Sequence, residues 1–191
     1  MFILDSESFK KARITLTLIF INILFFFTIS TNLEIQYLLV QINYSVIYEW
    51  QFWRLISAIF LHGDFLHLFS NMIGLLLFGV FLENNMPKMN FLIIYFVSGL
   101  IGNLFTLILL PIYSISLGAS GSIFGLIGAS FVMIATQRDK SLILLGGIYL
   151  LYFIISSLAP GINLWAHIFG LLGGILFGYL FYQKRKASIS Y

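Results

Sequence analysis

One serine of the chain has the neighbours that a nucleophile needs. Ser120 lies in the stretch Gly118-Ala119-Ser120-Gly121, directly before an apolar segment. Glycine permits unusual backbone dihedral angles and close approach of other groups. A serine at a helix N-terminus lies beside unpaired backbone N–H groups and the positive end of the helix dipole, and such donors can stabilise an oxyanion. An ordinary N-cap serine explains the same stretch, so this motif alone leaves both interpretations open.

Small residues follow His167 along one face of the last apolar segment, and a matching row follows Ser120: Gly170, Gly174 and Gly178 in the first row, and Gly121, Gly125 and Ala129 in the second. Such rows let two membrane helices pack closely. Glycine rows alone indicate only ordinary helix packing. Because His167 shares the face of its row, the pattern predicts that it comes within hydrogen-bond reach of Ser120. The imidazole could then take the hydroxyl proton while the serine oxygen attacks a substrate.

A third polar motif lies near the start of the second apolar segment. His67 and Asn71 are four residues apart, so both side chains lie on one helical face. Their N–H groups could complete an oxyanion hole, or they could make a polar contact between helices. Zinc bound by His62, His67 and His167 is conceivable, but none of the three has a second histidine one turn away, and no metal is predicted.

The composition determines what kind of molecule carries these residues. Hydrophobic residues make up 60% of the 191-residue chain and charged residues 9%, with a mean hydropathy of +1.02. Soluble domains contain about 45–50% apolar and about 25% charged residues. A water-soluble enzyme, a disordered chain and a coiled coil are therefore excluded. A nucleic-acid-binding protein is excluded too, because the basic residues cluster at segment ends. The chain has no cysteine, which excludes a disulfide framework and a thiolate nucleophile.

Short polar stretches separate six apolar segments, at about 14–32, 65–81, 89–110, 120–136, 142–158 and 164–182. We expect an all-α integral membrane protein, a bundle of six transmembrane helices in one domain over residues 1–191, because no period-two strand pattern competes. The segment from Ser120 to Thr136 has 17 residues, which rise about 25 Å. The hydrocarbon core is about 30 Å thick. Ser120 should therefore lie about 5 Å below the outer boundary, at the floor of a cavity that opens outward.

The basic residues predict the orientation. Nine of them lie on one side of the membrane if the six segments alternate, and Arg54 alone lies on the other: the nine are Lys10, Lys11, Arg13, Lys88, Arg138, Lys140, Lys184, Arg185 and Lys186. The positive-inside rule then places both termini in the cytoplasm. The outer connection, residues 33–64, is rich in aromatic residues and suits the headgroup region. It could be an ordinary interfacial anchor or could help to shape the site.

Charged side chains are missing from the middle of the predicted spans. Ionisable groups inside a membrane are costly and usually functional. An ion-coupled transporter or a two-aspartate protease would need carboxylates at that depth. The His-Glu-x-x-His motif of many metalloproteases is also missing. The polar candidates inside the spans are therefore hydroxyl, imidazole and amide groups.

Taken together, the motifs resemble the rhomboid family of intramembrane serine proteases. The resemblance rests on Gly118-Ala119-Ser120-Gly121, on Ala166-His167 with its following glycines, on His67-x-x-x-Asn71 and on Trp53-Arg54. It covers nearly the whole chain, as the minimal six-helix form of the family. Each motif alone is weak evidence for the family, but the whole set in this order along the chain is specific to it.

The resemblance implies a role for each matched residue. Ser120 would be the nucleophile and His167 the general base, without an aspartate to complete a triad. Asn71, His67 and the backbone N–H of Ser120 would bind the oxyanion, with Gly118 supporting that site. Phe124 would stack on the histidine ring, His62 would be structural, and Arg54 would fix the first outer loop.

The resemblance also implies a reaction. A substrate transmembrane helix would enter laterally, unwind and be cut near its outer end through an acyl-enzyme, with no metal or organic cofactor. The expected partners are transmembrane protein substrates and the lipid bilayer, not nucleic acid, and the expected location is a bacterial inner membrane. Two other functions stay open: an inactive relative that binds membrane clients without cutting them, and a small transporter or channel.

Overall fold

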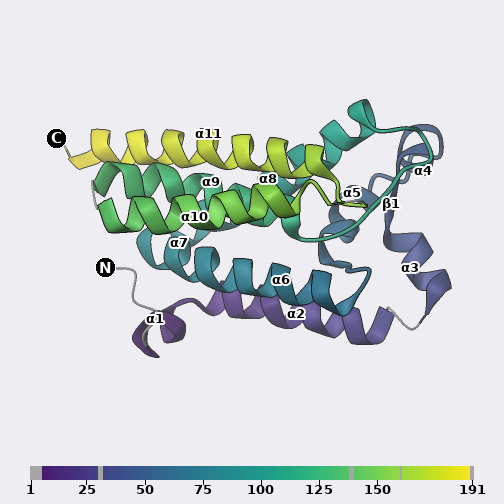
Figure 1. Ribbon diagram of the computed structural model, residues 1–191, viewed down its shortest axis with the longest axis horizontal. Coiled ribbons are helices and arrows are strands. Elements are labelled where there is room, and N and C mark those ends of the chain that lie inside the picture. The colour runs from purple at the N-terminus through teal and green to yellow at the C-terminus, as the bar shows by residue number, and fades with distance from the viewer. Residues whose placement is uncertain (1–5, 30–31, 138–139, 160, 190–191) are drawn as a thin grey trace.

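The computed structural model describes residues 6–29, 32–137, 140–159 and 161–189, most of which are helical. Figure 1 shows long helices that lie side by side, with short elements at the ends of the bundle. The long segments are α2 (Arg13–Ile29), a continuous rod of α6 (Phe65–Gly74), the π-helical turn η2 (Leu75–Gly79) and α7 (Val80–Asn85), then α8 (Lys88–Leu109), α9 (Ser120–Gln137), α10 (Lys140–Ser156) and α11 (Leu164–Ile189). Each apolar segment predicted from the sequence thus corresponds to one of these helical segments, and the predicted bounds differ from the helix ends by a few residues. Arg138, which entered the orientation argument, lies outside the described residues.

Three helices in the described ranges are long and apolar enough to cross a membrane. They are Phe65–Asn85, Lys88–Leu109 and Leu164–Ala187. Two further apolar helices, Arg13–Ile29 and Ser120–Thr136, are shorter. The helix that begins at Ser120 is short because a loop precedes it, so no additional helical turn extends it at that end.

The central helix of the bundle is α9. Every residue from Gly121 to Ser130 is buried. The apolar side chains of α9 join one core with those of the α6–η2–α7 rod and of α8, among them Ile123, Ile127, Leu75, Leu82, Phe91 and Ile94. Because neighbouring helices surround this part of α9, its position is fixed. Ser120, the first residue of α9, is therefore held in a defined place.

Glycines bring α9 and α11 into backbone contact. Three contacts follow one another along the two helices: Gly170 on Gly121, Gly174 on Gly125 and Gly178 on Ala129. A Cβ added to Gly174 would overlap the carbonyl group of Gly125. This is the register that the two predicted rows of small residues require, so that prediction is confirmed.

The short elements gather at the end of the bundle where α9 begins (Figure 1). They are α3 (Leu33–Leu39), β1 (Gln41–Ile42), α4 (Asn43–Tyr48), α5 (Arg54–Ser57), the 3-10 turn η1 (Ala58–Phe60) and β2 (Ile115–Ser116). The strands pair antiparallel, with Gln41 opposite Ser116. No strand is predicted from the sequence. A two-residue pair is too short to produce an alternating pattern, which is why it was not predicted.

Buried polar side chains hold these short elements in place. The Arg54 guanidinium donates hydrogen bonds to the Tyr37 and Val40 carbonyl oxygens at 2.5 and 2.7 Å. Gln41 donates to the Asn103 carbonyl oxygen of α8 at 3.0 Å, and Asn43 to that of Thr106 at 3.1 Å. The Tyr37 and Val40 carbonyls lie at the end of α3, where they lack helical partners, and the Asn103 and Thr106 carbonyls lie within α8. Strand β1 and the start of α4 are thereby fixed to α8.

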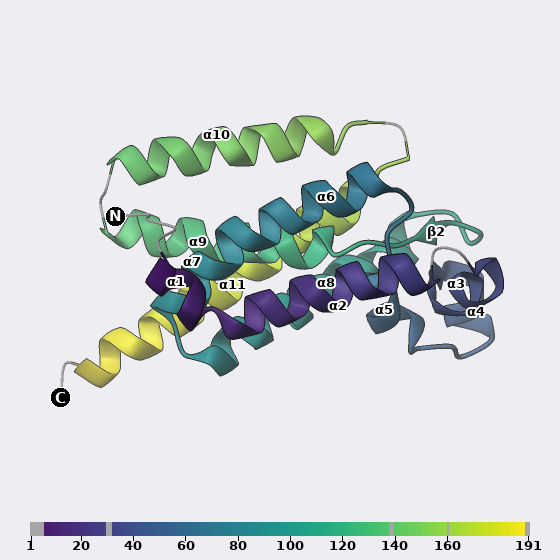
Figure 2. The same cartoon turned by 90° about the horizontal axis from the view of Figure 1, so that it is seen from below.

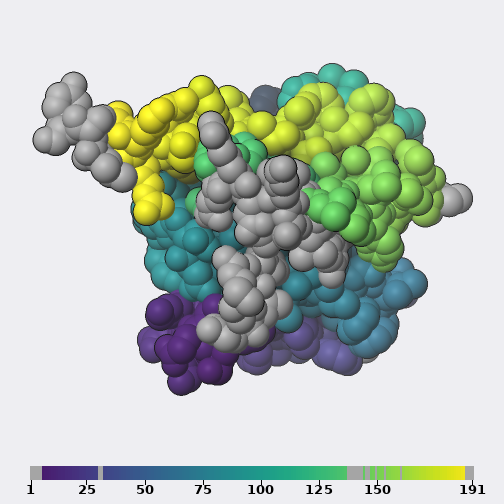
Figure 3. Space-filling model, turned by 60° about the vertical axis from the view of Figure 1, so that its left-hand side comes forward, coloured from purple at the N-terminus to yellow at the C-terminus, as the bar shows by residue number. Residues whose placement is uncertain are grey.

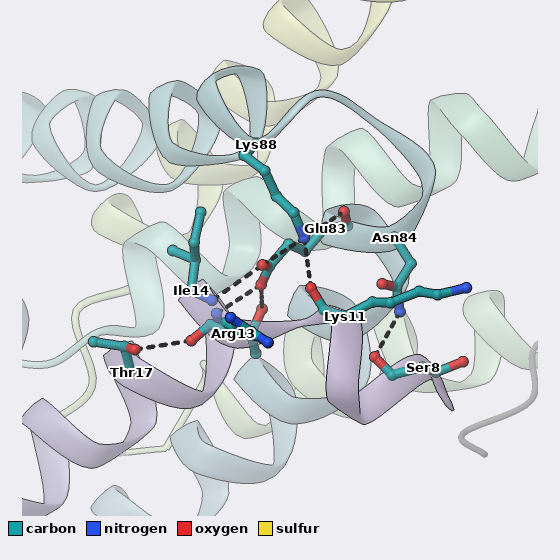
Figure 4. Close-up of polar contacts among 9 residues, drawn as sticks. Ser8, Lys11, Arg13, Ile14, Thr17, Glu83, Asn84 and Lys88 are labelled. Atoms are coloured by element: carbon teal, nitrogen blue, oxygen red, sulfur yellow. Dashed lines mark hydrogen bonds and ion pairs between the residues drawn. The ribbon is translucent and has the colours of Figure 1, made fainter. Parts of the chain in front are cut away.

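A buried carboxylate holds the opposite end together (Figure 4). Glu83 of α7 accepts hydrogen bonds from the backbone N–H groups of Ile14 and Thr15 at 3.0 and 2.7 Å. It also accepts from the Thr15 hydroxyl at 2.8 Å and pairs with the Lys88 ammonium at 2.8 Å. The first N–H groups of a helix have no acceptor within it, and a negative charge there is favourable. Glu83 therefore caps α2, which follows the short helix α1 (Ser6–Lys11).

Helix α10 lies at the periphery of the bundle, apart from α6 and α2 (Figure 2). Several of its described side chains are exposed, among them Leu144, Ile148, Leu151 and Ile155. Apolar side chains on an outer helix suit contact with lipid.

The glycine contact generates a stability prediction. Gly174→Ala would place Cβ against the Gly125 backbone, which cannot rotate away, so α11 must move off α9. We expect the free energy of unfolding to fall by about 2 kcal/mol, measured as a lower thermal midpoint in detergent. The matched control is Gly147→Ala in α10, where an added Cβ meets no atom within 4 Å. Alanine is the better helix former, so this control should be as stable as wild type. Equal midpoints for both variants would contradict the prediction.

Candidate active site

The structure brings Ser120 and His167 together. Ser120 begins α9 and His167 lies in the first turn of α11. The distance from Ser120 Oγ to His167 Nε2 is 2.7 Å, a hydrogen bond. His167 is 8% exposed. The contact between Gly170 and Gly121 lies directly beside this pair and determines how far apart the two helices are there.

Two further contacts orient the His167 ring. The Phe124 ring stacks on it with centroids 4.3 Å apart and an angle of 14° between the planes. On the other ring nitrogen, Nδ1 lies 2.5 Å from the Ser157 hydroxyl oxygen. Ser157 is buried and follows directly after α10. Both ring nitrogens of His167 are thus engaged by hydroxyl groups.

The two bonds to His167 are mutually consistent for one tautomer. When the Ser120 hydroxyl donates to Nε2, the proton of the neutral ring is on Nδ1, which then donates to Ser157 Oγ. In this arrangement Nε2 is the nitrogen that can accept a further proton. The Ser157 hydroxyl is therefore placed to accept from Nδ1–H, which is the arrangement that a general base for Ser120 requires.

Gly118 brings a second imidazole close to Ser120. Its φ angle is +128°, a value that favours glycine, and its N–H donates to the Ala58 carbonyl oxygen at 2.9 Å. A Cβ at this position would lie 2.8 Å from His67 Nε2 and 3.7 Å from Ser120 Oγ. The His67 ring therefore lies against the backbone of Gly118, beside the start of α9.

Asn71 supplies an amide one turn after His67 on α6. The side chain is 3% exposed, and its Nδ2 has no hydrogen-bond partner among the described residues. Buried donors are nearly always paired. An unpaired amide on the helical face of His67 is therefore a candidate donor to a bound group.

Two other residues singled out from the sequence, His62 and Arg54, make their contacts with residues other than Ser120 and His167. His62 is 1% exposed, and its ring lies edge-on to that of His67 with centroids 5.0 Å apart. His62 therefore packs against the His67 ring and limits its movement. Arg54 bonds within the connection between α2 and α6, to Gln51, Tyr37 and Val40, and is not brought to the Ser120–His167 pair.

Sequence reasoning missed two residues at this site. One is Ser157, which looked like an ordinary polar residue at the end of a span. The other is Asn163, whose Oδ1 accepts from the Ala166 N–H at 3.1 Å. Its Nδ2 donates to the Thr106 and Ser116 hydroxyl oxygens at 2.8 and 3.0 Å. An asparagine before an apolar run is a helix-start signal and could have identified Asn163, whereas nothing local distinguishes Ser157.

The described residues contain no group of three or more His, Cys, Asp or Glu side chains that could hold a metal ion. The functional groups at the site are thus two hydroxyls, two imidazoles, an amide and the backbone N–H groups at the start of α9. Such a set can activate an alcohol nucleophile and bind an oxyanion.

An apolar helical bundle with a hydrogen-bonded serine–histidine pair between two of its helices indicates a membrane protein with a polar site inside the bundle. The Rhomboid domain family model matches residues 49–184. The chain belongs to the rhomboid family. Together with its long apolar helices, this membership makes it a multi-pass membrane protein.

Curated relatives carry the family name. The "Putative rhomboid protease YdcA" of Bacillus subtilis is 40% identical over 145 residues, which are 72% of this chain and 70% of that protein. RHOMBOID-like protein 6, mitochondrial, of Arabidopsis thaliana is 35% identical over 71% of this chain and 46% of its own length. Rhomboid protease GluP of Bacillus subtilis is 33% identical over 89% of this chain and 35% of its own length. The chain thus spans less than half of the latter two relatives, and the protease names support a protease function.

The burial of His62, outside the long helices, generates a pH prediction. Burial lowers the pKa of His62 from 6.5 to about 3, with a smaller contribution from His67. Between these values the unfolded chain binds a proton that the folded chain does not, so stability falls as the pH falls below 6.5. We expect His62 to contribute about 2 kcal/mol to the loss of unfolding free energy between pH 7.5 and pH 5.

The measurement is the free energy of unfolding in detergent at a series of pH values. His62→Gln removes the titrating group. Below pH 6.5, the slope of unfolding free energy against pH should therefore be smaller in the variant, by the amount that corresponds to the uptake of about one proton on unfolding. The comparison uses slopes, and a constant loss of stability in the variant does not affect it. Identical slopes for the variant and wild type would contradict the assignment.

Proposed function

We propose that the chain is an intramembrane serine endopeptidase with Ser120 as nucleophile and His167 as general base. The observation that carries the proposal is the 2.7 Å hydrogen bond between Ser120 Oγ and His167 Nε2. The Ser157 contact at Nδ1 and the stacked Phe124 ring support it, because they hold the imidazole in the geometry that the reaction needs.

The chemistry follows from these atoms. Ser120 Oγ attacks the carbonyl carbon of the scissile peptide bond while its proton passes to His167 Nε2. When the C–N bond breaks, Nε2 returns that proton to the leaving amine, and an acyl-enzyme on Ser120 remains. Water then attacks the ester with His167 again acting as base, which releases the new carboxyl terminus and regenerates the serine.

The oxyanion that forms in both steps needs donors. We assign them as the backbone N–H of Ser120, the Asn71 amide and the His67 imidazole. The unpaired, buried Nδ2 of Asn71 and the position of His67 against Gly118 support this assignment. Donors held in place before the reaction stabilise the charge without reorganisation, and the edge contact from His62 helps to hold His67.

The substrates in this proposal are transmembrane helices cut near their outer ends. The bundle has six spans with both termini in the cytoplasm of a bacterium, and Ser120 faces the outer side of the inner membrane. Exposed aromatic residues on the outer connection, among them Trp50, Phe52 and Trp53, support its position in the headgroup region. A substrate helix must unwind there, because a regular helix hides its carbonyl groups.

The deciding experiment is cleavage of a fluorescent transmembrane substrate in liposomes. We expect wild type to cut it, and Ser120→Ala and His167→Ala each to lower kcat/KM by at least about 10³-fold. The matched control is Ser122→Ala, because Ser122 is a buried serine two residues further along α9. It should keep its activity and should still be labelled at Ser120 by a serine-directed phosphonate.

Two results would overturn the proposal. The first is full activity in folded Ser120→Ala. The second is a wild-type protein that neither cuts a panel of transmembrane substrates nor reacts with the phosphonate, which is the behaviour of a protein that binds membrane clients without cutting them.

Ser157 is a positioning residue in this proposal, since it acts through His167. In Ser157→Ala the Nδ1–H of the imidazolium loses its acceptor, so kcat should fall about tenfold with KM unchanged. Ser157→Thr restores a hydroxyl and should recover most of the activity. Ser156→Ala, at the neighbouring exposed position, is the control and should behave like wild type. Equal losses in Ser157→Ala and Ser157→Thr would indicate a purely structural role.

A further inference from the structure

A second hollow lies at the end of the bundle far from Ser120. It has a volume of about 1030 Å³. Three regions form its walls: the turn between α7 and α8, the second half of α9 and the last turns of α11. Figure 3 brings this end forward and shows the yellow end of α11 near the teal segment that contains the turn. The hollow is separate from the candidate active site, because Ser120 and His167 lie at the opposite ends of α9 and α11.

The charge at the mouth of this hollow is strongly positive. Lys184, Arg185 and Lys186 line it, and none of the lining residues that the structure describes is an Asp or Glu. Arg185 donates to the Asn85 carbonyl oxygen at 3.2 Å, which ties the end of α11 to the α7–α8 turn. Glu83, the acidic residue closest to this turn in the sequence, is buried and already bonded to Lys88 and the start of α2. The mouth therefore favours an anion.

The walls are mostly apolar. Met86, Pro87, Ala129, Met133 and Phe181 contribute to them. In a multi-pass membrane protein such a hollow lies beside lipid. An apolar wall below a cluster of cations is complementary to an amphiphile with an anionic head, because the phosphate can form charge-assisted hydrogen bonds while the chain stays out of water.

We propose that this basic pocket binds one anionic phospholipid. The phosphate contacts Lys184, Arg185 and Lys186, and an acyl chain lies along Met133 and Phe181. Basic pockets between membrane helices are suited to such headgroups. The bound lipid bridges the α7–α8 turn, α9 and α11. Because it binds the folded bundle, it raises the thermal midpoint with increasing lipid concentration.

The test uses the full chain in a neutral detergent, titrated with phosphatidylglycerol or with phosphatidylcholine of the same chain length. Native mass spectrometry measures bound lipid, and thermal unfolding measures the shift in midpoint. We expect one phosphatidylglycerol to be retained and the midpoint to rise to a plateau. Phosphatidylcholine should have little effect. Soluble glycerol phosphate is the third ligand, and it should neither bind tightly nor stabilise.

Three variants distinguish binding in this pocket from attraction of the lipid by the overall positive charge of the chain. Lys184→Gln/Lys186→Gln should weaken phosphatidylglycerol binding about 30-fold, since each basic residue near an anionic headgroup contributes about a factor of five. Lys10→Gln/Lys11→Gln removes the same charge from α1, outside the pocket, and should bind like wild type. Met133→Trp keeps every cation but narrows the cavity where the acyl chain would lie, and should weaken binding of phosphatidylglycerol.

Several outcomes would overturn the proposal. Equal binding of the two phospholipids would remove the role of the anionic head. Equal weakening by the α1 pair would assign the effect to overall charge, and full binding by folded Met133→Trp would show that the cavity is not used. Stabilisation by glycerol phosphate alone would indicate a site for free phosphate. If Lys184→Gln/Lys186→Gln does not fold, Met133→Trp and the three ligands still decide the question.

Discussion

The backbone contact between α9 and α11 is the interaction on which the rest of the structure depends. In lipid, apolar side chains gain little by leaving one apolar surface for another, so helices associate through close packing and polar contacts. Gly121 and Gly125 on α9 meet Gly170 and Gly174 on α11 with no side chain between them. The separation of Ser120 and His167 is therefore determined by main-chain atoms rather than by flexible side chains. This is the rigidity that a catalytic pair requires.

Buried polar groups in this bundle are of two kinds. Arg54, Asn43 and Glu83 have their hydrogen bonds made, and each holds a short element or a helix end in place. The Asn71 amide, by contrast, is buried and unpaired among the described residues. A buried polar group without a hydrogen-bond partner is costly. The first kind maintains the fold, and the Asn71 amide leaves an unpaired donor on the helical face of His67.

Much of the fold could be predicted from the sequence, because lipid allows few structures and because small residues mark helix contacts at fixed spacing. The pairing of Ser120 with His167 followed from two rows of glycines. Ser157 could not be predicted, since its contact with His167 depends on how the loop after α10 folds back. The two-residue β pair and the cap that Glu83 makes on α2 join segments far apart in the chain, and no local pattern encodes them. Asn163 did carry a local signal, as an asparagine before an apolar run.

The Glu83 contact also has a consequence for how the chain is assembled during synthesis. Glu83 follows Thr15 by 68 residues, so α2 emerges from the ribosome long before its cap exists. Until α7 has been synthesised, the N–H groups of Ile14 and Thr15 lack this acceptor. Lys88, which completes the ion pair, emerges only a few residues after Glu83. The start of α2 therefore obtains its cap only after nearly half of the chain has been made.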